Sequence, residues 1–294
     1  MKKVVVFGGA GFMGGYTVRR LQREKIYDVY SYDCSPSTDV DKSRRIVSSI
    51  LNKEDVRNAI KGASVVFNYA AIADIEDCIE SPIEAVKTNI LGNAIILDEC
   101  AKLKIERYIF ASSVYAESDL GGVYRTTKLS CESLIRDYHK YHDLNYTILR
   151  YGTLYGPGAT LKNSVHRFLR QALTTGIIAY HGTGKEKREY IHASDAAELT
   201  LLALEKKYEN RCLILTGERV LKSSDLFSII KEILNNDMTV EYDYAETKGL
   251  IKSHYQTTPY SYTQTIPKKL MGSEYIDIGL GLIDCLKDID RGEK

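Results

Sequence analysis

The sequence predicts an α/β protein in which a doubly wound parallel sheet is combined with a smaller, interleaved C-terminal domain. Three observations predict this fold. The chain opens with a continuously apolar, β-branched run at residues 4–7, glycines end that run abruptly, and strand and helix patterns then alternate as far as residue 150. A strand that is apolar at every position is buried on both faces, which is typical of a parallel sheet covered by helices.

The individual elements follow from the spacing of the apolar residues, which differs between amphipathic helices and doubly buried strands. An alternation of strand and helix predicts a parallel sheet with helices on its faces. Along the first half of the chain we expect strands over residues 4–7, 28–32, 64–68, 108–111 and 146–150, and helices over residues 13–23, 53–60, 83–103 and 124–141.

Beyond Pro157 the pattern loosens. Helices are expected over residues 165–174 and 193–206, and a further helix over 225–234 follows the cap residues Ser223-Ser224. The last part of the chain is rich in Tyr and Thr and shows little periodicity. We therefore expect a smaller, irregular C-terminal domain that covers the carboxyl ends of the strands, where open α/β sheets bind ligands.

Composition excludes several classes of protein. With 40 basic and 39 acidic side chains the 294-residue chain has a formal charge of +1, so no overall field attracts nucleic acid or an anionic membrane. The six cysteines lack the spacing of disulfide frameworks or metal sites, so we expect no metal. No run approaches the ~20 apolar residues of a membrane span, and the first apolar run stops at Phe7. The sequence therefore predicts a soluble, cytoplasmic protein.

A glycine-rich loop follows the first strand directly. Residues 8–14 read Gly-Gly-Ala-Gly-Phe-Met-Gly, which satisfies G-x-x-G-x-x-G and, one residue later, G-x-G-x-x-G. Small residues are needed because the backbone must turn tightly and approach a pyrophosphate, with the amides of a helix N-terminus facing the anion. The position between a buried strand and a helix distinguishes the loop from an ordinary glycine-rich turn. The residues expected to bind a dinucleotide here are Gly8, Gly11, Phe12, Met13 and Gly14.

Asp33 ends the second expected strand, 19 residues beyond Gly14. A carboxylate at this position accepts hydrogen bonds from the ribose hydroxyls and repels a 2′-phosphate, and no arginine follows it immediately. The sequence therefore favours a Rossmann fold that binds NAD rather than NADP. The alternative is that Asp33 is a solvated side chain at a strand end.

The pattern Tyr-x-x-x-Lys occurs twice, at Tyr124/Lys128 and at Tyr244/Lys248. The first pair lies at the start of an expected helix, where residues i and i+4 share a face, and it follows a strand that ends with Ser113. An adjacent ammonium favours the phenolate of a tyrosine, whose ordinary pKa is near ~10. We expect Tyr124 to be the catalytic acid/base, Lys128 to supply the charge and Ser113 to hydrogen-bond the same substrate oxygen.

With these motifs in place, the sequence resembles the extended short-chain dehydrogenase/reductase superfamily, in particular its NAD-dependent epimerase/dehydratase branch, which acts on nucleotide sugars. The resemblance covers nearly the whole chain. Its landmarks occur in chain order as Gly8-x-x-Gly11-x-x-Gly14, Asp33, Asp55-Val56, Asn68-Tyr69-Ala70-Ala71, Asn89, Ser112-Ser113, Tyr124-x-x-x-Lys128, Leu149-Arg150-Tyr151, Tyr155-Gly156-Pro157 and Arg188-Glu189-Tyr190-Ile191-His192.

The resemblance implies further cofactor contacts. It places Asp55 and Val56 at the adenine. It places Ala70 and Asn89 on the ribose and nicotinamide side, and Tyr151 near the nicotinamide carboxamide. Simpler roles remain open, since Asp55 also suits the first turn of a helix and Ala70 also suits sheet packing.

On the substrate side, the resemblance implies that Arg188 grips the diphosphate of a nucleotide-diphosphate sugar, a task for which a planar set of donors is suited. Two departures from the family concern the sugar. Tyr124 follows Ser113 by only 11 residues, where relatives have a noticeably longer loop, and Thr153 stands where many relatives have Asn. We expect a reshaped substrate entrance with Thr153 as a substrate contact.

The type of reaction is predicted from the acidic side chains near Ser113 and from the preferred cofactor. Dehydratases and decarboxylases of this type place an acid just after the active-site Ser or Thr. Here Val114-Tyr115 stands there, and Glu117 is out of register unless the short loop brings it inward. Reductases that consume the cofactor usually take NADPH, which Asp33 disfavours. We therefore predict a redox-neutral epimerase that resembles UDP-sugar 4-epimerases and works through a transient 4-keto sugar. The alternatives are a dehydratase or reductase of the same family and a non-catalytic dinucleotide-binding regulator.

The resemblance also guides the domain and subunit organisation. Relatives commonly dimerise by pairing two helices per subunit, so a homodimer through residues 83–103 and 124–141 is expected. The expected domains are residues 1–160 together with 188–216 for NAD binding, and residues 161–187 together with 217–294 for substrate binding.

Overall fold

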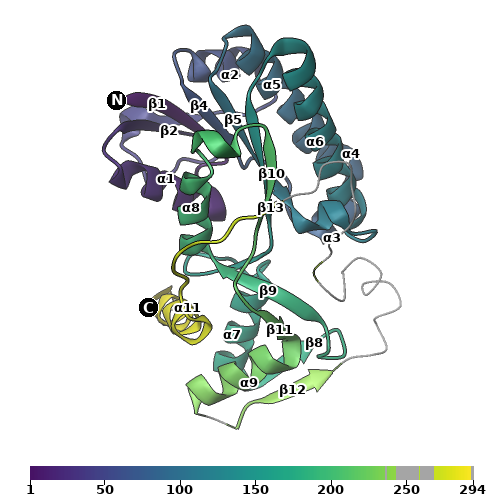
Figure 1. Cartoon of the computed structure of the whole chain (residues 1–294). Helices are drawn as coiled ribbons and strands as arrows, with labels where there is room; N and C mark the ends of the chain where they lie inside the picture. Colours follow the sequence, from purple (N-terminus) through teal and green to yellow (C-terminus); the bar gives the residue numbers. More distant parts are fainter. Residues whose placement is uncertain (236, 243–257, 259–267, 293–294) are drawn as a thin grey trace.

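The computed structural model describes residues 1–235, 237–242, 258 and 268–292. Its centre is a parallel sheet of eight strands: β1 (Lys2–Phe7), β2 (Tyr27–Asp33), β3 (Arg45–Val47), β4 (Val65–Asn68), β5 (Arg107–Ser113), β6 (Tyr146–Tyr151), β10 (Arg211–Leu215) and β13 (Lys268–Lys269). The strand order is β13-β10-β6-β5-β4-β1-β2-β3 (Figure 1). The order reverses between β1 and β4, which is where open parallel sheets bind their ligands.

Helices cover both faces of this sheet and bury residues 4–7 of its first strand completely. Val4 and Val6 of β1 join the hydrophobic cluster on one face, while Val5 and Phe7 join the cluster on the other, as the alternation of a strand requires. The predicted doubly buried strand is therefore confirmed. One face packs against α1 (Phe12–Arg23) and α8 (Ala193–Leu202), and the other against α2 (Lys53–Ile60), α5 (Gly92–Lys102) and α6 (Gly122–His142) (Figure 1).

A second group of elements lies below the large sheet in Figure 1 and surrounds a core of its own. It holds a three-stranded sheet with the order β11-β9-β7 and a two-stranded pair of β12 and β8. Its elements are β7 (Thr153–Tyr155), β8 (Ile177–Tyr180), β9 (Lys187–His192), β11 (Val220–Lys222), β12 (Thr239–Tyr242), α7 (Ser164–Thr174), α9 (Ser223–Leu234) and α11 (Ile278–Gly292). Because β7 follows β6 after a single residue, the two sheets are joined directly beside β5.

The predicted fold class is confirmed, and one expected helix differs in kind. The helix expected over residues 83–103 is composite, because α4 (Pro82–Ala85) passes into a π-helical segment, Val86–Leu91, before α5 begins. A separate short helix, α3 (Ile75–Glu80), precedes it. A π segment holds an extra residue per turn, which the spacing of apolar residues does not reveal, and such segments are frequent at functional sites.

Other differences lie in the second half of the chain. The helix expected over residues 193–206 ends at Leu202, and Lys206–Tyr208 form a separate 3-10 helix. The expected Ser223-Ser224 cap is wrong, because α9 begins at Ser223 and the N-cap residue is Lys222, whose amide donates to Asp225 at 3.2 Å. The last part of the chain is more regular than expected, since it contains α11. The pair Tyr244/Lys248 lies outside the described residues.

Candidate active site

The glycine-rich loop between β1 and α1 forms a cradle that side chains would fill. Gly8 has a φ of +75°, which residues with a Cβ rarely adopt. A Cβ on Gly14 would lie 2.0 Å from the carbonyl oxygen of Gly8, and a Cβ on Gly9 would lie 2.4 Å from Oγ of Ser31. The loop backbone therefore packs directly onto the start of α1. This arrangement fits the pyrophosphate of a dinucleotide, which needs close approach to backbone amides.

Phe12 and Met13 begin α1, so their backbone amides are among those at the helix N-terminus that have no acceptor within the helix. The side chain of Met13 is buried in the core, and the ring of Phe12 packs edge-on against Tyr16 at 5.5 Å. Gly11 is the N-cap residue, and no side chain caps the helix at this position. The first amides of α1 are thus suited to an anion, and the contacts of Gly11, Phe12 and Met13 with a dinucleotide stay a prediction.

Asp33 lies at the edge of the cradle. Its Oδ2 accepts a hydrogen bond from the amide of Ala10 at 3.1 Å, and its Oδ1 accepts one from the amide of Ser35 at 3.2 Å. The half-buried carboxylate is thereby fixed next to the glycine loop. Its role in binding a ribose stays a prediction, and its position beside the loop is what that role requires.

Asp55 is connected to Asp33 through one residue. Oδ2 of Asp55 accepts hydrogen bonds from Oγ of Ser48 at 2.6 Å and from Nδ2 of Asn52 at 2.7 Å, and the amide of Ser48 donates to the carbonyl oxygen of Asp33 at 3.0 Å. The side chain of Val56 is fully buried between α2 and the sheet, so an adenine contact by this residue uses its backbone. Both adenine contacts stay predictions.

Ala70 and Asn89 hold the loop that follows β4. The backbone of Ala70 lies against Gly8, where a Cβ would be 2.6 Å from the amide nitrogen of Ala70. Asn89, in the π-helical segment, accepts from the amide of Ile72 at 2.8 Å and donates to the carbonyl of Ile72 and to Oγ1 of Thr127, each at 3.0 Å. Asn89 therefore joins this loop to the first turns of α6.

The expected catalytic residues come together at the carboxyl end of β5. Ser113 ends β5, Tyr124 lies in the first turn of α6 and Lys128 lies one turn later. A side-chain hydrogen bond connects Ser113 and Tyr124. Nζ of Lys128 lies 5.6 Å from the ring centroid of Tyr124 and 5.0 Å from that of Phe110, and it donates to the carbonyl oxygen of Ala111 at 2.8 Å. The structure thus gathers a phenol, a hydroxyl and an amine in one group.

Burial sets the acid–base properties of this group. It raises the pKa of Tyr124 to about 12, while the hydrogen bond with Ser113 acts in the opposite direction. Burial also lowers the pKa of Lys128 to about 8, against the opposing influence of Cys131, Cys78 and Glu132. A tyrosine with so high a pKa needs further positive charge beside it before it can act as a base near neutral pH.

A buried group of charged residues, which the sequence patterns did not predict, lies beneath the catalytic residues. Arg150 donates to Glu132 from Nε and from Nη2, at 2.8 Å each, and also forms an ion pair with Glu117. Oγ of Ser112 donates to Glu132 at 2.7 Å. The side chains of the three charged residues are at most 3% exposed. Although burial opposes it, the Arg150 guanidinium keeps the pKa of Glu132 below its usual range.

One signal for this group is present in the sequence. Tyr124, Lys128, Glu132 and Arg136 recur every four residues and therefore lie along one face of α6. Arg136 donates to Glu132 at 3.0 Å, so the lower half of this face is an ion-pair array and the upper half is the catalytic pair. The short loop does bring Glu117 inward, but its carboxylate faces Arg150.

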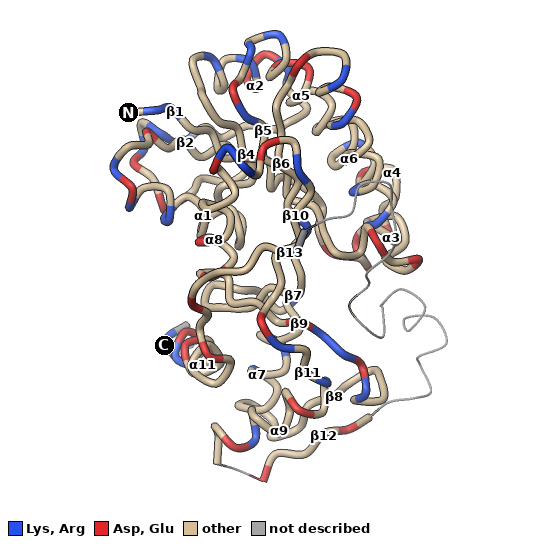
Figure 2. Tube along the Cα trace, in the orientation of Figure 1, with Lys and Arg blue, Asp and Glu red and all other residues tan. Residues whose placement is uncertain are grey.

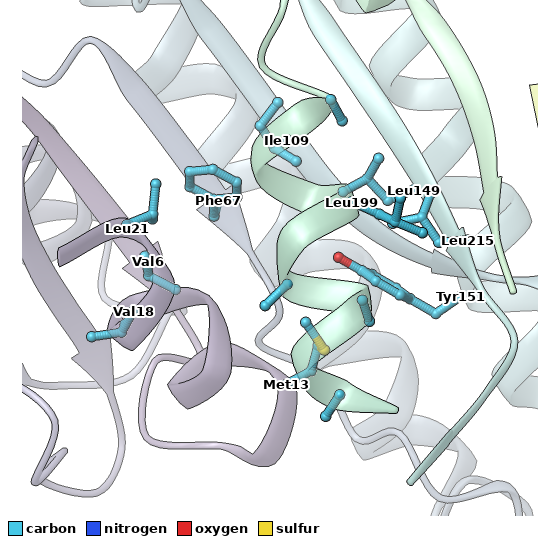
Figure 3. Packing of buried hydrophobic residues seen from close by; sticks show 14 of the residues in the cluster. Val6, Met13, Val18, Leu21, Phe67, Ile109, Leu149, Tyr151, Leu199 and Leu215 are labelled. Atoms are coloured by element: carbon cyan, nitrogen blue, oxygen red, sulfur yellow. The ribbon is translucent and has the colours of Figure 1, made fainter. Parts of the chain in front are cut away.

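Tyr151 ends β6 and points its side chain into the core beside α8 (Figure 3). Its hydroxyl lies 2.6 Å from Oγ1 of Thr200 and 3.0 Å from the hydroxyl of Tyr69, which lies 2.8 Å from Oγ1 of Thr17. This chain of hydroxyls connects α1, β6 and α8 beneath the glycine loop. The expected contact of Tyr151 with a nicotinamide stays a prediction, and it is restricted to the part of the residue that the core leaves accessible.

Thr153 and Arg188 belong to the smaller sheet. Thr153 of β7 pairs with Tyr190 of β9, and Arg188 lies two residues before Tyr190, so the three side chains share one face. β9 begins with the basic pair Lys187 and Arg188, which is blue in Figure 2. Nη1 of Arg188 donates to the carbonyl oxygen of Lys187 at 3.0 Å. The roles of Thr153 and Arg188 in binding a substrate stay predictions. Their sheet begins where β6 ends, and β6 is the neighbour of β5, which carries Ser113.

The residues that the structure describes offer neither a membrane span nor a metal centre. None of the helices there is both long and apolar enough to cross a bilayer. In the same residues, no three His, Cys, Asp or Glu side chains are grouped in a way that would hold a metal ion.

Comparisons with known proteins agree on the fold. A UDP-glucuronic acid 4-epimerase from Bacillus cereus, solved with UDP-glucuronic acid and NAD, superposes with a TM-score of 0.85 at 22% identity, over 98% of this chain and 99% of that chain. A UDP-glucose 4-epimerase from Thermotoga maritima, solved with UDP-glucose, gives a TM-score of 0.80 at 23% identity over 99% and 100% of the two chains.

Curated relatives are similar in sequence. A putative UDP-glucose 4-epimerase of Methanocaldococcus jannaschii is 27% identical over 250 residues, 78% of this chain and 81% of its own length. A UDP-N-acetyl-α-D-glucosaminuronate decarboxylase of Bacillus cytotoxicus is 28% identical over 244 residues, 74% and 75% of the two chains. Residues 4–213 match the model of the NAD-dependent epimerase/dehydratase family. The chain therefore belongs to this family of NAD-dependent enzymes, as its glycine cradle and its Ser113, Tyr124 and Lys128 group indicate.

Proposed function

We propose that this protein is an NAD-dependent nucleotide-sugar epimerase that inverts C4 of a UDP-sugar through a transient 4-keto sugar. The observation that carries the proposal is the grouping of Ser113, Tyr124 and Lys128 at the carboxyl end of β5, two strands from the glycine cradle. The burial of Glu117 against Arg150 supports epimerisation over elimination, because it leaves this acid engaged in an ion pair instead of facing a substrate.

Each catalytic side chain has a separate task in the proposed reaction. Tyr124 takes the proton of the C4 hydroxyl as C4 is oxidised and gives it back when C4 is reduced. Ser113 donates to the same oxygen and holds it while its charge changes. Lys128 supplies positive charge that favours the phenolate of Tyr124. NAD, when bound, supplies a reversible hydride acceptor, so the overall reaction leaves the mass and the redox state of the sugar unchanged.

The smaller sheet is proposed to hold the rest of the substrate. Arg188 is assigned to the diphosphate, which a guanidinium binds through a planar set of donors, and Thr153 is assigned to the sugar. The proposed domains are residues 1–160 with 188–216 for NAD and residues 161–187 with 217–294 for the nucleotide sugar, and Thr153 and Arg188 are substrate contacts that the first set contributes from strands of the smaller sheet. The UDP-sugar ligands of the structurally similar enzymes support the choice of substrate class.

The first test is an anaerobic incubation of the purified protein with UDP-, GDP- and dTDP-sugars, with products identified by mass and by NMR while NADH absorbance is followed. Isomers of unchanged mass without net NADH are the expected result. Loss of water or of carbon dioxide would reassign the protein to the lyases, and stoichiometric NADH oxidation would reassign it to the reductases. Absence of any product, with NAD bound, would favour a non-catalytic regulator.

The proposed enzyme is a cytoplasmic homodimer that pairs the helices around residues 83–103 and 124–141 of two subunits. Large apolar side chains on these helices and on α3 support this, since Ile79, Ile83 and Leu91 are at least half exposed. Sedimentation of the protein is expected to give a dimer, and Ile83→Glu is expected to give a folded monomer. Monomeric wild-type protein at micromolar concentration would contradict the homodimer.

A further inference from the structure

The short loop between β5 and α6 carries a second tyrosine close to the catalytic one. The ring centroid of Tyr115 lies 6.4 Å from that of Tyr124, and the two planes are inclined by 78°, which is an edge-to-face contact. A Cβ on Gly121, whose φ is +101°, would lie 2.7 Å from Cδ1 of Tyr115. The ring of Tyr115 therefore covers the glycine that leads into α6, and the side chain is half-buried.

The loop is fixed on both sides of Tyr115. The amide of Tyr115 donates to Oγ of Ser113 at 3.3 Å, and the amide of Ser118 donates to the carbonyl oxygen of Tyr115 at 2.9 Å. Glu117 is anchored by its buried ion pair with Arg150. A segment held by this many contacts opens rarely, so Tyr115 is part of a rigid wall and not of a movable flap.

Tyr115 lies on the side of the catalytic group that faces away from the glycine cradle. Together with Leu120, it packs against the buried cluster of Val114 and Ile214. Ile214 belongs to β10, which the strand order places beyond β6, whereas β1 and the glycine loop lie on the other side of β5. The smaller sheet begins on this same side, where β6 runs on into β7.

We propose that Tyr115 is a specificity-determining residue that forms a wall of the sugar site and limits the size of the substituent at C5. This inference rests on the proposed function. Tyr124 acts on the oxygen at C4, and the sugar carbons next to C4 are C3 and C5. The aromatic ring of Tyr115, which packs edge-on against Tyr124, therefore reaches a substituent on one of these two carbons. The substituent at C5 is the one that distinguishes pentoses, hexoses and hexuronates.

The test compares UDP-sugars that differ at C5 with sugars that differ at C2. For Tyr115→Ala, the ratio of kcat/KM for UDP-glucose to that for UDP-xylose is expected to rise at least tenfold over wild type. The ratio for UDP-N-acetylglucosamine to UDP-glucose, which differ at C2, is expected to change less than threefold. Tyr115→Phe keeps the ring and is expected to keep the wild-type ratios, and Tyr141→Ala, on an exposed residue of α6, serves as a control.

Binding measurements separate the inference from the proposed function. In a Tyr124→Phe background with NAD, calorimetry gives the Kd of UDP-xylose and of UDP-glucose without turnover, and Tyr115→Val is used if Tyr115→Ala does not fold. An unchanged ratio of these Kd values, or an equal change in the C2 and C5 series, overturns the role of Tyr115. If the wild-type protein epimerises no UDP-sugar while substitution of Tyr115 still changes the ratio of the two Kd values, the role of Tyr115 is supported and the proposed reaction is wrong.

Discussion

Glu132 of α6 and Arg150 of β6 form a bidentate ion pair, in which Nε and Nη2 of Arg150 each lie 2.8 Å from one carboxylate oxygen of Glu132. Both side chains are almost completely buried. Glu132 lies two helical turns after Tyr124, and Arg150 lies one residue before the end of the strand that leads into β7. The pair therefore fixes the catalytic helix relative to the strand that connects the two sheets.

Removing Glu132 is expected to be strongly destabilising. In Glu132→Ala the guanidinium of Arg150 loses its bidentate partner while it stays buried, so the free energy of unfolding should fall by about 3–5 kcal/mol. Urea unfolding measures this. Glu84→Ala breaks an exposed pair with Lys87 and should cost less than about 1 kcal/mol. Equal losses in the two variants would show that the buried pair contributes no more than a surface one.

The phenol of Tyr124 is expected to be essential for turnover and dispensable for binding. Tyr124→Phe removes the acid/base group, so kcat should fall by about 10²- to 10⁴-fold. The affinity for NAD, measured by calorimetry, should stay within a factor of about three. Tyr141→Phe alters an exposed residue of the same helix and should leave both quantities unchanged. Retention of wild-type kcat in Tyr124→Phe would remove Tyr124 from the mechanism.

The lowered pKa of Lys128 predicts a particular dependence of stability on pH. Between pH 8 and 10.5 the unfolded chain keeps the proton on Lys128 while the folded protein releases it, so the unfolded state binds more protons. The contribution of Lys128 to stability therefore rises with pH across this window, by up to about 3 kcal/mol.

Urea unfolding at pH 7, 8.5 and 10 checks this against Lys128→Met, which cannot titrate. The free energy of unfolding of the wild type relative to the variant should increase from pH 7 to pH 10. A difference that is constant with pH would mean that Lys128 has an ordinary pKa in the folded protein.

Asp33 is expected to select NAD against NADP. In Asp33→Asn the negative charge that repels a 2′-phosphate is removed and the hydrogen bonds to the ribose weaken. The ratio of Kd for NADP to Kd for NAD should therefore fall by about 10- to 100-fold. Asp41→Asn, in the segment after the same strand and largely exposed, should leave this ratio unchanged. An unchanged ratio in Asp33→Asn would move the selection to another residue.

The hydroxyl groups of Thr17, Tyr69, Tyr151 and Thr200 form a chain that has one proton too few for every contact in it to be a hydrogen bond. Its four hydroxyls make three contacts with one another and two more with backbone carbonyls, at Met13 and Ala196, but they carry only four protons. Tyr69→Phe removes two contacts and one proton, which leaves each remaining contact with a proton. Its free energy of unfolding should therefore change by less than about 1 kcal/mol.

Tyr108→Phe is the matched comparison. The hydroxyl of Tyr108 donates to Asn93 at 2.6 Å and accepts from Asn68 at 2.9 Å, deep in the other face of the sheet. Its removal leaves buried amide groups short of partners and should cost about 1–3 kcal/mol. If thermal unfolding ranks Tyr69→Phe as the more damaging change, the count of protons in the chain is wrong.

The parts of the site that were predicted from the sequence are those in which few neighbouring residues determine the geometry. Gly8 and Gly14 are required by one turn, and Tyr124 and Lys128 by one helical face. The cluster of Arg150 with Glu117 was not predicted, because it depends on how a loop and a strand meet in space. The smaller sheet escaped prediction for a different reason, since its two outer strands, β7 and β11, have three residues each and are too short to show a period.

The strand order has a consequence for how the protein is made. β6 is complete at Tyr151, but its outer neighbour β10 ends at Leu215, and the strand that covers β10 comes from Lys268–Lys269. A chain leaving the ribosome therefore carries an open sheet edge, first at β6 and then at β10, until its last part has been translated. Unpaired sheet edges promote association between chains, so β6 and then β10 are open to pairing with other chains during this stage of synthesis.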